Sequence, residues 1–321
     1  MKLKPYIIIL ISALLGMAGC LKEIPKNENE DEIVILATFL PVYCFVDQVA
    51  GGLPGVKVEI LAEGEAANPH HFNLRPGDMK KISQADIIVR HGLSIDSFLD
   101  KKILKSSGAS DSSALITLVE GIPPQQLLGN LKGKSFDRDI ISSGSTAWDT
   151  LNPHVWVSPT KASIMARYLS RELAKLLPVH HDSLIIRGNR YSLQLDSLAD
   201  RYKDAIRGSS NNLIVTQHNS MFWLARDTGL SILGAIEKVG GADPGPRAFY
   251  MFEKEIKRNP PIGIFVDPNV PSNLAESVSL NTNVTIYPFD PVGRGTVKSG
   301  KYLETMQNNL SILMDALAEP S

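Results

Sequence analysis

The segment Asp182–Arg207, DSLIIRGNRYSLQLDSLADRYKDAIR, predicts one long helix around which the rest of the chain is arranged. Its apolar residues fall on one helical face, and no proline interrupts them. They are Leu184, Tyr191, Leu195, Leu198, Tyr202 and Ile206. At 1.5 Å per residue the helix would be roughly 40 Å long, enough to cross a small protein. It is either a core helix of one large domain or a connection between two halves.

Short aliphatic segments alternate with amphipathic segments before this helix. They predict strands at 33–37, 56–61, 85–89 and 114–118 and helices at 42–49, 77–84 and 160–176. Strands that alternate with helices are typical of a mainly parallel sheet. Residues 123–150, which contain many Gly, Ser and Asp, predict a long irregular segment.

The same alternation resumes after the long helix. It predicts strands at 213–216, 231–235, 263–266 and 284–287 and helices at 220–228, 249–257, 273–280 and 302–317. We therefore expect an α/β fold of two lobes with mainly parallel sheets, joined by the long helix. The expected lobes are residues 33–179 and 209–321, with the linker helix at 180–208. A cleft between two lobes is the expected place of a functional site.

The composition is that of an ordinary globular protein. Of 321 residues, 43% are hydrophobic and 21% are charged, which argues against disorder. The 33 basic and 34 acidic residues leave a formal charge of −1, and no basic tract occurs. These values give no indication of nucleic-acid binding.

The first twenty residues predict an export signal. Lys2 and Lys4 precede the apolar run 6–15, and small residues then lead to Cys20. This arrangement resembles the bacterial lipoprotein signal, in which Cys20 becomes the lipidated first residue; a signal peptide with a chance cysteine is the alternative. Residues 21–32 predict a solvated tether. We expect an exported protein, lipid-anchored to a bacterial membrane at the cell surface or on the periplasmic face.

Cys44 is the other cysteine of the chain. If Cys20 carries lipid, no internal disulfide can form. The neighbours of Cys44 are mainly apolar and favour a buried core residue over a metal ligand.

Three of the seven histidines stand where an α/β protein places ligands. His70 and His154 each follow a proline, which stiffens the backbone that presents them. His218 follows a predicted strand, and ligands bind at the carboxyl ends of strands in open α/β sheets. Imidazole suits zinc, and three histidines with a carboxylate or water complete a tetrahedral site.

The other polar candidates have simpler interpretations. His71 is the alternative to His70, whereas His91 is interpreted as structural. His180 and His181 adjoin the long helix and are expected to be exposed to solvent. Asp267 and Asp290 each close a predicted strand before a proline, a pattern that also starts turns.

Several motifs follow one another along the chain: TFLPVY at 38–43, NPHHF at 68–72, PGDMKKISQAD at 76–86, the segment 92–99, NPHVWVSP at 152–159, QH at 217–218 and IFVDP at 264–268. In this combination they resemble the solute-binding lipoproteins of zinc and manganese ABC importers. The resemblance covers nearly all of the mature chain. It implies two α/β lobes joined by a rigid backbone helix, with one divalent metal ion between them.

The resemblance also implies the ligands. His70 and His154 match the ligands of the first lobe, His218 the first ligand of the second lobe, and Asp290 the last acidic position. Either Asp290 or water would complete the shell. Manganese-binding members look to have a glutamate at the position of His218, so a third imidazole favours Zn²⁺.

Two departures from the family pattern stand out. Asn152 replaces the aspartate that usually precedes the proline and His154, which leaves a carboxylate partner for that histidine in doubt. The chain also lacks the long histidine-rich loop of many zinc members.

These features predict a protein that captures a divalent metal ion outside the cytoplasm and delivers it to an ABC-transporter membrane permease. We expect a monomer without enzymatic activity. The same scaffold with Mn²⁺, Fe²⁺ or a metal chelate is one alternative. A zinc-dependent hydrolase is another, although HExxH and a glutamate placed as a general base are missing from the sequence.

Overall fold

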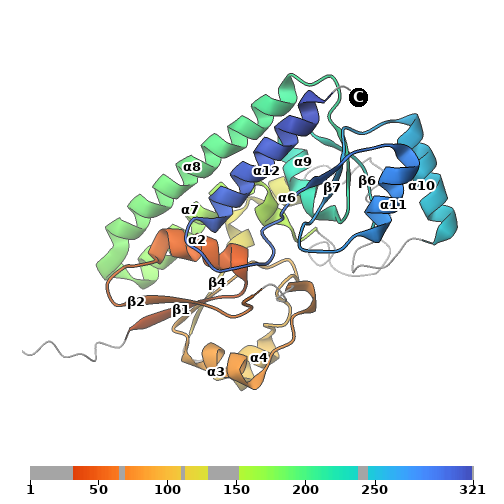
Figure 1. The fold of residues 1–321 in the computed structure, drawn as a ribbon. Helices are drawn as coiled ribbons and strands as arrows, with labels where there is room; N and C mark the ends of the chain where they lie inside the picture. Colours follow the sequence, from red (N-terminus) through yellow and green to blue (C-terminus); the bar gives the residue numbers. More distant parts are fainter. Residues whose placement is uncertain (1–31, 65–68, 110–112, 129–151, 238–244, 320–321) are drawn as a thin grey trace, which may run out of the picture. The chain divides into compact units, whose positions relative to one another are not determined.

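The computed structural model describes residues 32–64, 69–109, 113–128, 152–237 and 245–319. The predicted signal, Cys20 and the tether therefore lie outside the described residues, as does most of 123–150. Residues 33–321 group into one compact unit, and its described part contains two four-stranded sheets (Figure 1). We call the sheet of β1–β4 with its helices the first lobe and the sheet of β5–β8 with its helices the second lobe.

The strands lie close to the predicted positions. Those of the first lobe are β1 (Ile33–Ala37), β2 (Val56–Ile60), β3 (Ile87–Arg90) and β4 (Ala114–Thr117). Those of the second lobe are β5 (Leu213–Thr216), β6 (Ser231–Ala235), β7 (Ile264–Val266) and β8 (Ile286–Pro288).

Every long predicted helix is present. The first lobe contains α2 (Leu40–Ala50), α3 (Pro76–Gln84), α4 (Lys101–Ser106), α6 (Pro124–Leu128) and α7 (Pro159–Leu176). The helices that follow are α8 (His181–Arg207), α9 (Phe222–Thr228), α10 (Pro246–Arg258), α11 (Asn273–Thr282) and α12 (Lys301–Ala318). The short α4 and α6 were not predicted, because helices of so few residues have little periodicity to detect.

Both sheets have the same topology. The strand orders are β2-β1-β3-β4 and β6-β5-β7-β8, and every pair is parallel. In each sheet the chain first adds a strand toward one edge and then crosses over to build toward the other edge. The switch point lies between the two central strands. Ligands bind in the crevice at such a switch point. In the second lobe this crevice lies between the ends of β5 and β7, where Val215 pairs with Ile264.

The long helix α8 connects the two lobes. All six of its predicted apolar residues are buried. It packs against α2 and α7 of the first lobe and against α9 and α12 of the second (Figure 1). The prediction of a connecting helix is therefore confirmed.

Small residues let α7 and α8 approach closely. A Cβ added at Gly188 would lie 2.2 Å from the Cβ of Ser170, so no larger residue fits there. One turn further along α8, the backbone carbonyl oxygen of Ser192 accepts a hydrogen bond from the hydroxyl of Ser163 at 3.2 Å. Gly188 and Ser192 thus lie where α8 contacts α7 of the first lobe.

One hydrophobic cluster extends through both lobes. It includes Phe45 and Leu169 of the first lobe and Trp223, Phe265 and Leu310 of the second. Because this apolar cluster is shared, we regard the lobes as parts of one folding unit.

Cys44 belongs to the same cluster and is 2% exposed, as predicted for a core residue. Burial raises the pKa of its thiol to about 12. At neutral pH it is a protonated, inert core side chain.

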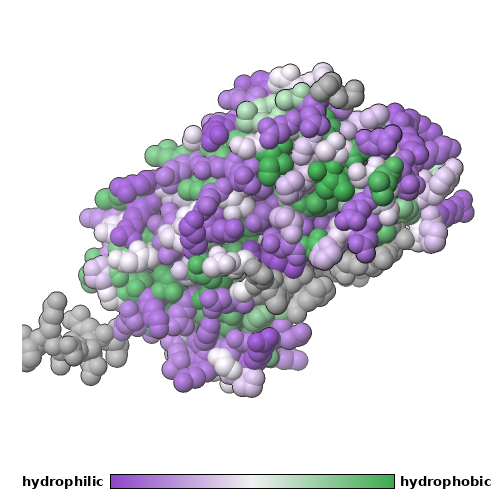
Figure 2. All heavy atoms as spheres, viewed as in Figure 1, coloured by the Kyte–Doolittle hydropathy of each residue, from purple (hydrophilic) through white to green (hydrophobic). Residues whose placement is uncertain are grey.

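On the face shown in Figure 2, hydrophobic residues form small separate patches among hydrophilic ones. Among the described residues, none of the helices has the length and apolar character needed to span a bilayer.

Candidate metal centre

Three of the predicted ligands come together in the structure. Ring nitrogens of His70, His154 and His218 all lie within 4.8 Å of one another. His70 lies on the short 3-10 helix Pro69–His71, which follows β2, and His154 caps the 3-10 helix Val155–Val157. His218 follows β5 directly at the switch point of the second sheet. The cluster therefore joins the two lobes.

The three imidazoles face one another at short range. The Nε2 atoms of His70 and His154 are 3.0 Å apart. The ring centroid of His218 lies 4.9 Å from that of His154 and 5.7 Å from that of His70. The buried Nε2 of His218 has no hydrogen-bond partner among the described residues. A cluster of nitrogen atoms with one buried nitrogen left unsatisfied is what a metal ion would complete.

Burial keeps two of these imidazoles neutral. It lowers the pKa of His154 well below its usual value, and the neighbouring His218, His70 and His91 lower it further. Burial also lowers the pKa of His218, while Asp267 acts in the opposite direction. Only a neutral imidazole offers its lone pair to a metal ion, so these two side chains are ready to bind at neutral pH.

The histidines line a pocket of about 200 Å³. Two acidic residues of the second lobe, Glu237 and Asp267, line it as well. Gln217 connects them, because its side-chain amide donates to Oε1 of Glu237 at 2.8 Å and its Oε1 accepts from the backbone N–H of Asp267 at 3.1 Å. The pocket thus combines imidazoles with nearby negative charge, which suits a cation.

Glu237 was not predicted as a site residue. Glu237 lies just beyond the end of β6, and β6 is the neighbour of β5 in the sheet. His218 and Asp267 lie in the same way just beyond the ends of β5 and β7. This position at a strand end was the one available signal in the sequence.

The structure does not bring Asp290 into the histidine cluster. Its Oδ1 accepts from the backbone N–H of Val292 at 2.7 Å, and its Oδ2 lies 3.8 Å from Nζ of Lys301. Burial raises the pKa of its carboxyl group. Asp290 stabilises the turn after β8, and Asp267, the other acid that closes a strand, lines the pocket instead.

The remaining histidines have different surroundings. His91 is fully buried, with its Nε2 2.8 Å from the carbonyl oxygen of Pro153, so it supports the backbone next to His154. This contact agrees with the structural role predicted for it. The side chain of His181 is 59% exposed and that of His180 is partly exposed. The side chain of His71 lies outside the described part of the structure.

The segment 152–158, which carries His154, is fastened to the second lobe. The indole N–H of Trp223 donates to the carbonyl oxygen of Asn152, and that of Trp156 donates to the carbonyl oxygen of Pro291, both at 2.8 Å. The hydroxyl of Ser158 donates to Oδ2 of Asp227 at 2.5 Å. His154 is therefore positioned by both lobes.

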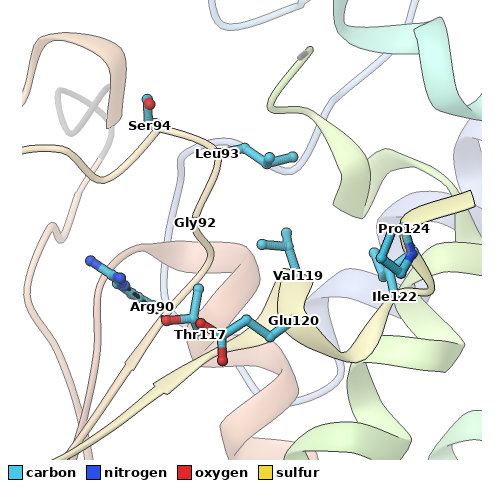
Figure 3. Close-up of a pocket in the computed structure, with 9 residues that line it drawn as sticks. All are labelled: Arg90, Gly92, Leu93, Ser94, Thr117, Val119, Glu120, Ile122 and Pro124. Atoms are coloured by element: carbon cyan, nitrogen blue, oxygen red, sulfur yellow. Dashed lines mark hydrogen bonds between the residues drawn. The ribbon is translucent and has the colours of Figure 1, made fainter. Parts of the chain in front are cut away.

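A second pocket lies in the first lobe at the ends of β3 and β4 (Figure 3). It has a volume of about 420 Å³ and its charged lining residues are Arg90 and Glu120. Arg90 donates its Nε to the hydroxyl of Thr117 at 3.0 Å. This larger pocket has no cluster of metal-ligating side chains among its lining residues, so we place the functional site at the histidines.

Comparison with known families identifies the class of protein. The sequence model of the family described as "Zinc-uptake complex component A periplasmic" (ZnuA) matches residues 35–316. The chain therefore belongs to the ZnuA family, a family of solute-binding proteins.

Two curated relatives illustrate the similarity. Zinc-binding lipoprotein AdcA of Streptococcus pneumoniae is 24% identical over 299 residues, which cover 90% of this chain and 56% of AdcA. The chain thus spans about half the length of that relative. High-affinity zinc uptake system protein ZnuA of Haemophilus influenzae is 23% identical, with coverage of 95% of this chain and 98% of that protein.

A solved structure supports the fold. The solute-binding protein FpvC of Pseudomonas aeruginosa, in complex with Mn²⁺, superimposes with a TM-score of 0.75 at 23% identity. The match covers 89% of this chain and 98% of FpvC. The predicted two-lobed α/β architecture is confirmed.

Proposed function

We propose that this protein binds one Zn²⁺ ion between its lobes and delivers it to the membrane permease of an ABC importer. The observation that carries the proposal is the cluster of His70, His154 and His218, three residues from distant segments whose ring nitrogens lie within 4.8 Å. The names of the curated relatives AdcA and ZnuA, a zinc-binding protein and a zinc-uptake protein, support it.

We propose that the three imidazoles bind the ion and that water completes a tetrahedral shell. Asp290 is bonded elsewhere, so water is the better candidate for the fourth position. Glu237 and Asp267 would then stabilise the charge of the ion from the pocket wall. A set of three imidazoles favours Zn²⁺ over Mn²⁺, which prefers oxygen ligands.

Metal titration tests this proposal directly. The chain from Leu21 would be stripped with a chelator and titrated with Zn²⁺, Mn²⁺ and Fe²⁺ by competition calorimetry. One tight zinc equivalent is expected. A preference for manganese would contradict the role of His218 and favour the alternative cargo, and the Mn²⁺ in FpvC makes this comparison necessary.

We propose a transport role without catalysis. Three histidines with an open position also describe catalytic zinc, so zinc-dependent hydrolysis of ester or amide substrates is the outcome to exclude. Assays with and without added zinc make that distinction.

We further propose that the protein is an exported monomer, anchored through lipid at Cys20. The name of AdcA, a lipoprotein, supports this placement. The proposed organisation is a signal at 1–20, a tether at 21–32, lobes at 33–179 and 209–321, and a linker at 180–208. Membrane fractionation of a Cys20→Ala variant tests the anchor, and light scattering tests the monomer.

A further inference from the structure

Asn152 has hydrogen bonds to both sides of the metal site. Its side-chain oxygen, Oδ1, lies 2.9 Å from the backbone nitrogen of His154 and 3.0 Å from Nδ1 of the same residue. Its side-chain nitrogen donates to the carbonyl oxygen of Asn219 at 2.6 Å. Asn219 is the residue next to His218, so one amide group contacts the neighbourhood of both ligands.

The partners of this amide determine its orientation. The carbonyl oxygen of Asn219 can only accept a hydrogen bond, so the atom beside it is the amide NH₂ group. The other end is therefore the oxygen, which also accepts from the backbone N–H of His154. An amide oxygen is an acceptor only, so Nδ1 of His154 carries the proton. Its Nε2 is then the nitrogen with the free lone pair, and this atom faces His70.

We propose that Asn152 is a positioning residue with two functions. It fixes His154 in the Nδ1–H tautomer, so that Nε2 is presented to the metal ion, and it couples this ligand to the chain segment of His218 through Asn219. The inference rests on the proposed function, because it concerns the geometry of the same metal site.

The amide group is required for the second function. A carboxylate at position 152 would still accept from Nδ1 of His154, but it has no hydrogen to donate to Asn219. Two acceptor oxygens would then face each other across the 2.6 Å contact that the amide now bridges. The amide of Asn152 thus supplies a hydrogen bond between the lobes that a carboxylate could not make.

The segment does not depend on this side chain for its fold. Trp223 binds the backbone carbonyl of Asn152, and His91 lies within hydrogen-bond distance of the carbonyl of Pro153. We therefore expect Asn152 variants to fold, with the change confined to the imidazole and the contact with Asn219.

The chain offers a closely matched control at Asn211. Its Oδ1 accepts from the backbone N–H of Leu213, two residues later, and its Nδ2 donates to the carbonyl oxygen of Pro260. This is the same pair of bonds that Asn152 makes with His154 and Asn219, without an imidazole. Substitutions at Asn211 therefore measure how much stability is lost when an asparagine that makes these two hydrogen bonds is replaced away from the metal site.

The experiment compares Asn152→Ala and Asn152→Asp with the same substitutions at Asn211, all in the chain from Leu21. Nitrogen-15 NMR of the metal-free proteins gives the tautomer of His154, and chelator competition gives the zinc affinity. Asn152→Ala should lose the fixed tautomer and weaken zinc binding roughly 10- to 100-fold, as loss of an outer-shell partner does. Asn152→Asp should keep the tautomer and still bind zinc about tenfold more weakly.

Each outcome decides one part of the proposal. An unchanged tautomer in Asn152→Ala overturns the first function, and wild-type zinc affinity in Asn152→Asp overturns the second. Equal losses in the Asn211 variants would mean that the effect is general destabilisation, which also overturns the proposal. If the wild-type protein binds no zinc, the proposed function fails, whereas the tautomer of the metal-free protein still tests the hydrogen bond itself.

Discussion

The Nε2 atoms of His70 and His154 lie 3.0 Å apart, although 84 positions separate these residues in the sequence. Two ring nitrogens at this distance share either one proton or one metal ion. With the unpartnered Nε2 of His218 beside them, a metal ion satisfies all three rings at once.

Removal of any one of these imidazoles should therefore abolish tight zinc binding. In His70→Ala, His154→Ala and His218→Ala, zinc affinity should fall by more than roughly 10- to 100-fold. That range is typical when a hydrogen-bond partner of a ligand is lost but the ligand itself remains. Chelator competition measures the loss, and His181→Ala, at an exposed position, is the control. Wild-type affinity in His218→Ala would contradict the proposed ligand set.

The metal-free protein should become less stable as the pH falls. Burial lowers the pKa of His91 to about 3, against about 6.5 in an unfolded chain. Below pH 6.5 the unfolded chain therefore takes up a proton that the folded protein does not, and stability falls until about pH 3. His91 alone predicts a loss of about 2 kcal/mol between pH 7 and pH 5.

Denaturant unfolding at the two pH values measures this loss. In His91→Gln the side-chain amide can still donate to the carbonyl of Pro153 but does not titrate. This variant should show a smaller pH dependence than the wild type. The same pH dependence in both proteins would show that His91 is not responsible.

The close contact between α7 and α8 makes Gly188 sensitive to substitution. Gly188→Ala places a methyl group 2.2 Å from the Cβ of Ser170, and the helices must separate to relieve the clash. Overpacking of this kind typically costs about 1–3 kcal/mol in the free energy of unfolding. Gly208→Ala, where no atom lies within 4 Å of the added group, is the control. Equal stability of the two variants would argue against the observed packing.

The buried ion pair of Lys161 and Asp227 connects α7 to α9 across the lobes. Nζ of Lys161 lies 2.8 Å from Oδ1 of Asp227, and the side chains are 4% and 12% exposed. Asp227→Asn should cost about 3–5 kcal/mol, because it leaves a buried ammonium group without its counter-charge. Loss of the exposed pair Lys298–Glu304 by Glu304→Gln should leave the stability almost unchanged, because water screens both charges. Chemical denaturation distinguishes the two expectations.

Zinc binding should not change the overall dimensions of the protein. The lobes share α8 and one hydrophobic cluster, and a wide hinge movement would expose that cluster to water. Small-angle scattering curves recorded with and without zinc should therefore superimpose. A clear decrease in the radius of gyration on zinc binding would contradict this expectation.

Much of the fold could be predicted because its signals are local. The apolar residues of α8 recur at helical spacing, and the short aliphatic segments are typical of buried strands. The strands β1, β5 and β6 have the predicted bounds. The ends of these strands also explain why His218 could be proposed as a ligand from the sequence, since ligands of a parallel sheet bind there.

The details of the site could not be predicted in the same way. Sequence gives the position of a residue but not the direction of its side chain at a turn. Asp267 and Asp290 both precede a proline after a strand, yet only Asp267 lines the pocket, because the carboxylate of Asp290 bonds to its own turn. Similarly, the contact of Asn152 with Asn219 depends on the packing of two lobes, which no local pattern encodes.

The anchoring of residues 152–158 also bears on the order in which the protein matures. A chain is made from its N-terminus onward, and this segment is complete before its partners Asp227 and Pro291 have been synthesised. His154 therefore reaches its final position only after residues much later in the sequence have been made. Tyr302, whose hydroxyl donates to the carbonyl oxygen of Trp156, is later still in the sequence. A nascent or truncated chain would hold these histidines without their final geometry, so the proposed zinc binding would begin only when nearly the whole chain has folded.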